Sequence, residues 1–400
     1  MAHIRDRWYK TVDGQKVPTA QHGTQLRYMG RYLDSDGRER SKTFRRKLDA
    51  RRWLDEITAD LVTGRYVDPG AGRVTLGEHA QRWLAAQTFD PSTREAVTSR
   101  LRTHVYPHLG RTELRNLRPS TIQSWLRGRQ EAIAPSYVRL LLVNLSAILG
   151  AAVEDGLIPS NPCASSAVRA PKVDRERVVP WPVARVLAVA AAHPEPYRAV
   201  PLVAAGLGLR QGEVFGLRVE DVDFLRRRVR ARQQVKLLGG RPVLAPPKGG
   251  AEREVPLPDT VAVALAERLR AFPPVVVTLP WREPGAGERS AQLVFTTRER
   301  GPLIRNHYNR HVWKPALVAA GVEPRGNGMH ALRHHYASVL LESGVSIRAV
   351  ADYLGHAAPG FTLRTNAHLM PQSEDRARDA VDAALGPRAE RGRNREDTDG

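Results

Sequence analysis

The strongest candidates for chemistry lie in the sequence Gly-Met-His-Ala-Leu-Arg, where His330 opens a predicted helix. His330 and Arg333 are at positions i and i+3, so they share one face of that helix. Further along, the chain contains Tyr-Leu-Gly-His, which ends at His356. An arginine, two imidazoles and a helix N-terminus together can bind an oxyanion of the kind that phosphoryl transfer requires.

Two more cations are candidates for the same chemistry. Arg210 follows an apolar predicted helix and precedes a second one that begins near Gln211, and its guanidinium can bond two phosphate oxygens at once. Lys248 lies in Pro-Pro-Lys-Gly-Gly, which predicts a β-hairpin turn from which a lysine can protonate a leaving oxygen. Taken alone, an arginine such as Arg210 is more often a surface ion-pair partner, and most lysines at hairpin turns are merely solvated.

A metal site is the alternative for the histidines. His330 and His334 are at positions i and i+4, a spacing that can chelate a cation. The neighbouring sequence contains neither a ligating carboxylate nor the His-Glu-x-x-His pattern, so we favour the anion site. A metal-dependent nuclease would need an acidic cluster, which the sequence does not offer. We therefore expect no cofactor and no metal.

Three segments and a tail position these residues. Residues 1–65 predict a small β-sheet, with strands at 25–33 and 38–44, and a helix over 45–63. Residues 74–165 predict a helical domain between two Pro/Gly-containing linkers, with helices over 75–86, 92–105, 119–129 and 136–155. Thr75 and Glu78 predict a capping box at the first of these. A two- or three-stranded sheet with a basic face fits a DNA groove.

Residues 175–385 predict the largest domain, which is mixed α and β. Period-two character over 222–258 predicts a small antiparallel sheet around the turn Leu-Gly-Gly that ends at Gly240. Helices are expected over 182–192, 197–207, 259–270, 305–319, 330–343, 347–354 and 372–385. The polar, charged residues 386–400 predict a disordered tail. The fold class is mainly α with small antiparallel β-sheets.

The bulk composition favours a nucleic-acid partner. Lys and Arg number 62 against 42 Asp and Glu, a net charge of +20 that is spread over all three predicted domains. Such a field suits a long polyanion, although a genome that prefers arginine codons gives the same excess. A single cysteine excludes a disulfide framework and a cysteine-rich zinc site. We see neither a signal peptide nor an apolar run near the ~20 residues that span a bilayer, and expect a soluble cytoplasmic protein.

The order Arg, Lys, His-x-x-Arg, Leu-Gly-His resembles the catalytic domain of the tyrosine recombinase (phage integrase) family. The three-domain layout over residues 1–385 is similar to that of integrases from phages and mobile elements. The resemblance implies that 1–65 is an arm-type DNA-binding domain, 74–165 a core-binding domain and 175–385 the catalytic domain.

The resemblance also implies a metal-free reaction on double-stranded DNA. Arg210 and Arg333 would bind the scissile phosphate, and His330 would act as general acid and base. His356 would hydrogen-bond the phosphate and Lys248 would protonate the leaving 5′ oxygen. Glu213 matches a supporting acidic position. Four protomers would act on two duplexes, with accessory DNA-bending or excision factors, in the cytoplasm and at the nucleoid.

The nucleophile departs from the family pattern. The family tyrosine lies ten residues after the Leu-Gly-His histidine, and that position is Asn366. A carboxamide cannot attack a phosphate, so we expect severely reduced cleavage. Two hypotheses follow: a site-specific integrase that carries a substituted nucleophile, or a catalytically silent relative that occupies attachment sites or regulates excision.

Overall fold

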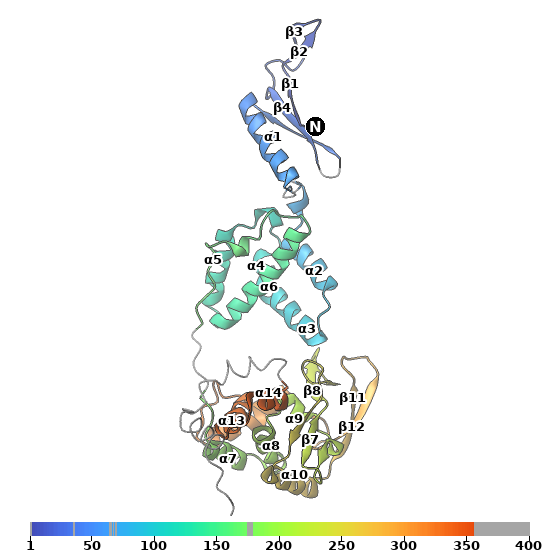
Figure 1. The fold of residues 1–400 in the computed structure, drawn as a ribbon, viewed down its shortest axis with the longest axis vertical. Coiled ribbons are helices and arrows are strands. Elements are labelled where there is room, and N and C mark those ends of the chain that lie inside the picture. Colours follow the sequence, from blue (N-terminus) through green and yellow to red (C-terminus); the bar gives the residue numbers. More distant parts are fainter. Residues whose placement is uncertain are drawn as a thin grey trace, which may run out of the picture. The chain divides into compact units, whose positions relative to one another are not determined.

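The computed structural model describes residues 2–34, 37–63, 66, 68, 70–173 and 179–355 (Figure 1). It divides into two compact units, Met1–Arg175 and Glu176–Gly400. Helices dominate both units and every strand ladder in the described residues is antiparallel, which confirms the predicted fold class.

The N-terminal part of the first unit is a three-stranded sheet with one helix packed on it. The sheet has the order β1-β4-β5, with β1 at His3–Asp6, β4 at Tyr28–Leu33 and β5 at Glu39–Phe44. A separate hairpin joins β2 (Tyr9–Val12) to β3 (Gln15–Pro18). The sequence predicted β4, β5 and the helix; β1 and the exposed β2–β3 hairpin were missed because their short strands lack a clear apolar alternation.

Helix α1 (Lys47–Val62) covers this sheet through an aromatic contact. The Trp53 ring lies edge-on to Tyr32, with 5.4 Å between the ring centroids, and a second 5.4 Å contact joins it to Phe44. Gly30 makes room for the indole, since a Cβ there would lie 3.0 Å from Trp53 Cε3. The sheet therefore buries one face against α1.

The remainder of the first unit is helical. Its elements are α2 (Leu76–Ala86), α3 (Pro91–Arg100), a π-helical turn (Leu101–Val105), α4 (Tyr106–Leu109), α5 (Pro119–Gln130) and α6 (Pro135–Glu154). The predicted capping box is confirmed: Glu78 N–H donates to Thr75 Oγ1 at 3.3 Å, and Thr75 N–H donates to Glu78 Oε2 at 3.0 Å. This box fixes the start of α2.

Helix α6 is the core of this helical body. Val138, Leu141, Leu145 and Ile148 are fully buried and pack with apolar side chains of α2, α3 and α5. By length and composition alone α6 could also cross a membrane, which corrects the expectation that no apolar run comes near that length. In the fold the apolar stripe of α6 is packed against the neighbouring helices, as in the core helix of a globular domain.

The second unit is built around helices that the sequence placed well. They are α7 (Val183–Ala191), α8 (Ala199–Leu207), α9 (Gln211–Phe215), α10 (Asp259–Ala271), α11 (Arg305–Tyr308), a π-helical turn (Asn309–Trp313), α12 (Lys314–Ala319), α13 (His330–Glu342) and α14 (Ile347–Leu354). Apolar α8 lies at the centre, packed against α7, α10 and α13. The expected helix over 372–385 and the tail lie outside the described residues.

The strands between α9 and α10 form two sheets, where the sequence predicted one. The turn after Leu238 joins β8 (Gln234–Leu238) to β9 (Arg241–Ala245). Strand β10 (Arg253–Pro256) pairs instead with β7 (Arg228–Ala231), which also pairs with β6 (Val222–Asp223). Lys248 therefore lies in a connection between two sheets and not at a hairpin turn, because the strands that flank it, β9 and β10, do not pair with each other.

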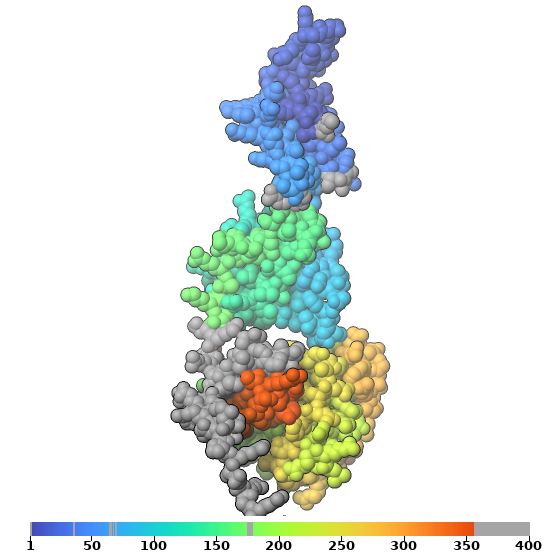
Figure 2. Space-filling model, viewed as in Figure 1, coloured from blue at the N-terminus to red at the C-terminus, as the bar shows by residue number. Residues whose placement is uncertain are grey.

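A second hairpin, which the sequence analysis missed, lies at the edge of this unit. Strand β11 (Val275–Pro280) pairs along its whole length with β12 (Glu288–Leu293). One face carries the buried Val277 and Leu279, and the other is exposed (Figure 2). Val276 is apolar although it lies on the exposed face, so β11 does not show the alternation of apolar and polar residues that predicts a strand.

Candidate functional site

The site begins at the sharp turn between α8 and α9. Gly208 has φ +61°, a left-handed conformation that favours glycine, and a Cβ there would lie 2.4 Å from Tyr336 Cδ1. This turn brings Arg210 to the first turn of α9. Tyr336 is buried on α13, and burial raises its pKa.

Glu213 holds Arg210 from within the same short helix. Its carboxylate accepts from the Arg210 backbone N–H at 2.8 Å and from the Arg210 guanidinium at 2.9 Å. The Glu213 side chain has no exposed surface, whereas that of Arg210 is 23% exposed. Glu213 thus holds both the backbone and the side chain of Arg210, which is a contact that suits the supporting role expected of it.

Arg253, on β10, is a member of the site that the sequence analysis missed. Its Nη1 and Nη2 donate to the two oxygens of Glu213 at 3.1 and 2.6 Å, and its Nε donates to the Tyr353 carbonyl at 2.7 Å. Only 7% of the side chain is exposed. The sequence signal was weak because arginine in a charged strand usually faces solvent, and its partner lies 40 positions away.

Arg333 reaches the same place from α13. Its Nη1 donates to the Gly208 carbonyl at 2.7 Å and its Nη2 donates to the Leu354 carbonyl. Burial and the charge of Arg210 lower the pKa of Arg333 to about 9. This part of the molecule therefore disfavours further positive charge and favours an anion.

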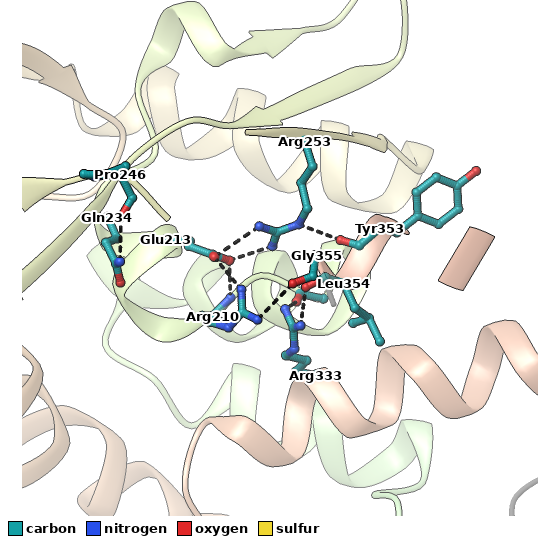
Figure 3. A network of polar contacts seen from close by, with 10 residues as sticks. Arg210, Glu213, Gln234, Pro246, Arg253, Arg333, Tyr353, Leu354 and Gly355 are labelled. Atoms are coloured by element: carbon teal, nitrogen blue, oxygen red, sulfur yellow. Dashed lines mark hydrogen bonds and ion pairs between the residues drawn. The ribbon is translucent and has the colours of Figure 1, made fainter. Parts of the chain in front are cut away.

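The three arginines meet at the C-terminus of α14 (Figure 3). The consecutive carbonyls of Tyr353, Leu354 and Gly355 accept from Arg253, Arg333 and Arg210 in turn, the last at 3.4 Å. We call these three side chains with Glu213 the arginine cluster. Carbonyls at a helix C-terminus carry partial negative charge, so they attract guanidinium groups. The cluster fixes the point from which the chain continues to His356.

His330 stands at the start of α13, one turn before Arg333. Its ring is edge-on to that of His334, with 4.7 Å between the centroids. Although its outer surface is exposed, burial of the rest of the ring, with the charges of His334, Arg333 and Arg210, lowers the pKa of His330 to about 4. At neutral pH the imidazole is uncharged and can accept a proton.

The other predicted site residues are not placed in the cluster. Lys248 is exposed in the β9–β10 connection, outside the contacts of the arginine cluster. His356 and Asn366 lie outside the described residues. As for metal ligands, the described ranges contain no group of three or more His, Cys, Asp or Glu side chains that could hold an ion. His330 and His334 thus have no third ligand of these types in that part of the chain.

Two family models match the chain. The phage integrase family matches residues 182–372, and the phage integrase central domain matches residues 76–168. The first range includes the arginine cluster and His330. The second includes the helical body from α2 to α6.

Curated relatives match over most of their length. A protein named as a prophage phiRv2 integrase from Mycobacterium tuberculosis is 29% identical over 84% of this chain and 88% of its own. The tyrosine recombinase XerC of a Methylobacterium species is 30% identical over 74% of this chain and 89% of its own. The integrase of Mycobacterium phage L5 is 25% identical over 81% of this chain and 85% of its own.

Solved structures share the fold. A Tn1549 transposon integrase in complex with a circular intermediate DNA aligns with a TM-score of 0.63 at 19% identity, over 77% of this chain and 99% of that one. A lambda integrase tetramer bound to a Holliday junction aligns with a TM-score of 0.56 at 19% identity, over 84% and 91%. With the two family models and the relatives, these matches establish that the chain belongs to the phage integrase family of tyrosine recombinases.

Proposed function

We propose that this chain is a site-specific integrase of a mobile genetic element. It binds double-stranded attachment sites and its catalytic domain is built for metal-free phosphoryl transfer, with Asn366 at the nucleophile position. The observation that carries the proposal is the convergence of Arg210, from the turn before α9, with Arg333 and His330, which share one face of α13. The names of the relatives, which are integrases and recombinases of phages, prophages and a transposon, support the same function.

The roles follow from the chemistry of each group. Arg210 and Arg333 bind the non-bridging oxygens of one phosphate, and neutralise charge that develops in the pentavalent transition state. His330, uncharged at neutral pH, would take the proton of an attacking tyrosine hydroxyl, the group that Asn366 replaces in this chain, and would return it on rejoining. His356 donates a hydrogen bond to the phosphate, and Lys248 protonates the leaving 5′ oxygen.

Asn366 sets the limit of this chemistry. A tyrosine would form a 3′-phosphotyrosyl bond and conserve the energy for rejoining. The carboxamide of asparagine does not attack phosphorus under these conditions, so this chain binds the site but cleaves it very slowly. The second candidate function is therefore a silent DNA-binding relative that occupies attachment sites or regulates excision.

The domains and partners are assigned on the same basis. We assign 1–65 to arm-type DNA, 74–165 to the core site and 175–385 to catalysis, with four protomers on two duplexes. The solved lambda integrase tetramer on a Holliday junction supports the last assignment. Accessory DNA-bending or excision factors would then select the direction of recombination.

Covalent trapping on a nicked suicide duplex tests the proposal. We expect no protein–DNA adduct from the chain as it stands, and an adduct from Asn366→Tyr. The double variant Asn366→Tyr with Arg333→Gln is the control and should lose the adduct while still binding DNA. An Asn366→Tyr chain that binds the duplex but forms no adduct would favour the silent binder.

A further inference from the structure

Arg253 has contacts that the phosphate chemistry alone does not require. It is nearly as buried as Arg333, but it lies on a strand of the β10-β7-β6 sheet and not on the helices that carry Arg210 and Arg333. It makes three hydrogen bonds of 3.1 Å or less, two to Glu213 and one to the Tyr353 carbonyl. Each of the three guanidinium nitrogens thus donates to the protein's own scaffold.

The sharing of Glu213 has an electrostatic consequence. Each of the two carboxylate oxygens accepts one hydrogen bond from Arg210 and one from Arg253. Burial acts to raise the pKa of Glu213, but Arg253 and Arg210 outweigh it and the pKa is lowered. If Arg253 were absent, this buried negative charge would be satisfied by Arg210 alone.

We infer that Arg253 is a positioning residue: it divides the charge of Glu213, so that Arg210 stays available to a DNA phosphate, and it anchors the end of α14 through Tyr353. The inference rests on the proposed function. Arg253 would not contact DNA itself. It would act on phosphate binding indirectly, through Glu213 and the end of α14. The backbone contact matters because Leu354 and Gly355, next in the chain, are the acceptors for Arg333 and Arg210.

A neutral-phosphate scan measures this role without requiring cleavage. The full chain with Asn366 is first footprinted on attachment-site DNA, and single methylphosphonates are then placed through the protected core duplex. Competition anisotropy gives the affinity lost at each position. At the phosphate bound by the cluster we expect a loss of roughly tenfold or more, because a charge-assisted contact is removed.

Arg253→Gln should reduce that discrimination to about threefold or less, since Arg210 would then be held by an undivided Glu213. Arg253→Lys keeps the charge but cannot bond Glu213 and the Tyr353 carbonyl together, so an intermediate value is expected. The matched control is Arg218→Gln. Arg218 makes a similar bidentate pair with buried Asp221, at 2.6 and 2.7 Å, outside the cluster, and its loss should leave the discrimination unchanged.

The outcomes separate the two ideas. Full discrimination in both folded Arg253 variants would overturn the positioning role and leave the proposed function intact. Equal losses in Arg218→Gln and Arg253→Gln would also overturn it, since general destabilisation would then be the cause. If the unsubstituted chain shows no sensitive phosphate at all, the proposed phosphate site fails and the positioning role fails with it.

Discussion

At the scale of single residues, the arginine cluster holds three guanidinium groups but only one carboxylate, that of Glu213. Arg210 and Arg253 share the Glu213 carboxylate, and the contacts described for Arg333 are to backbone carbonyls. Collecting such groups away from water costs free energy, and the lowered pKa of Arg333 expresses that cost. A phosphate bound among them would offset part of it, which is why an unfavourable arrangement in the empty protein suits a protein that binds DNA.

His330 provides a pH test at this scale. Its pKa of about 4 lies below the ordinary 6.5, so in the free protein the ring is neutral from pH 7 down to about 5. Because the unfolded chain binds the proton more readily, this group makes the fold less stable as the pH falls from about 6.5 to 4. A DNA phosphate close to the ring should raise the pKa again.

We therefore expect an NMR titration of the His330 ring to have its midpoint near 4 in the free chain and at a higher pH in the DNA complex. His330→Gln assigns the resonance. A midpoint near 6.5 in the free chain would contradict the buried, cation-rich setting. An unchanged midpoint with DNA bound would place the phosphate elsewhere.

Sequence reasoning found some of these residues and not others for a physical reason. His330 and Arg333 are one helical turn apart, so a local pattern reveals their common face. Arg210 and Glu213 are also local. Arg253 joins them only when β10 pairs with β7, a contact that no local spacing encodes.

At the scale of elements, the turn at Gly208 couples α8 and α9 to α13. Its left-handed φ and its contact with Tyr336 leave no room for a side chain, and its carbonyl accepts from Arg333. One glycine thus serves chain reversal, helix packing and the placement of a functional arginine. We expect this position to tolerate substitution very poorly.

Gly208→Ala tests this coupling. The left-handed backbone costs about 1 kcal/mol, and the overlap with Tyr336 adds roughly 1–3 kcal/mol. The control is Gly321→Ala, which has φ +73° but open space around its Cβ, so only the first cost applies. Urea unfolding, monitored by tryptophan fluorescence, compares the free energies of unfolding of the two variants. Equal losses of stability in the two variants would show that Tyr336 moves aside at little cost and that the turn at Gly208 is not tightly constrained.

Elements were predicted well where their signals are local. The Thr75 and Glu78 capping box and the apolar periodicity of α6 gave the correct helices. The antiparallel arrangement around the turn at Gly239 and Gly240 was predicted, but the division of its strands into two sheets, β8-β9 and β10-β7-β6, was not. Strand partners depend on contacts distant in sequence, and a turn motif specifies only the two strands that it joins.

At the scale of the whole molecule, the net charge of +20 governs encounter with DNA. The excess is distributed along the chain and not confined to one tail, so many phosphates can be neutralised together. Each neutralised phosphate releases counterions, and affinity then falls steeply with salt.

We expect the affinity of the full chain for its attachment-site duplex to fall roughly a thousandfold or more between about 50 and 200 mM salt, as for six to ten phosphate contacts. Fluorescence anisotropy at several salt concentrations gives the slope. A random duplex of equal length should bind more weakly with a steep slope of its own. A loss of less than about tenfold for the attachment site would mean that few phosphates are contacted.

We propose that this fold presents one DNA phosphate to position 366. The most direct measurement is mass spectrometry of the DNA-linked peptide from the Asn366→Tyr chain trapped on a nicked duplex. We predict a single phosphotyrosyl linkage at residue 366 and no linkage from the chain with Asn366. A linkage at another residue, such as Tyr353, or an adduct from the unsubstituted chain, would contradict the account.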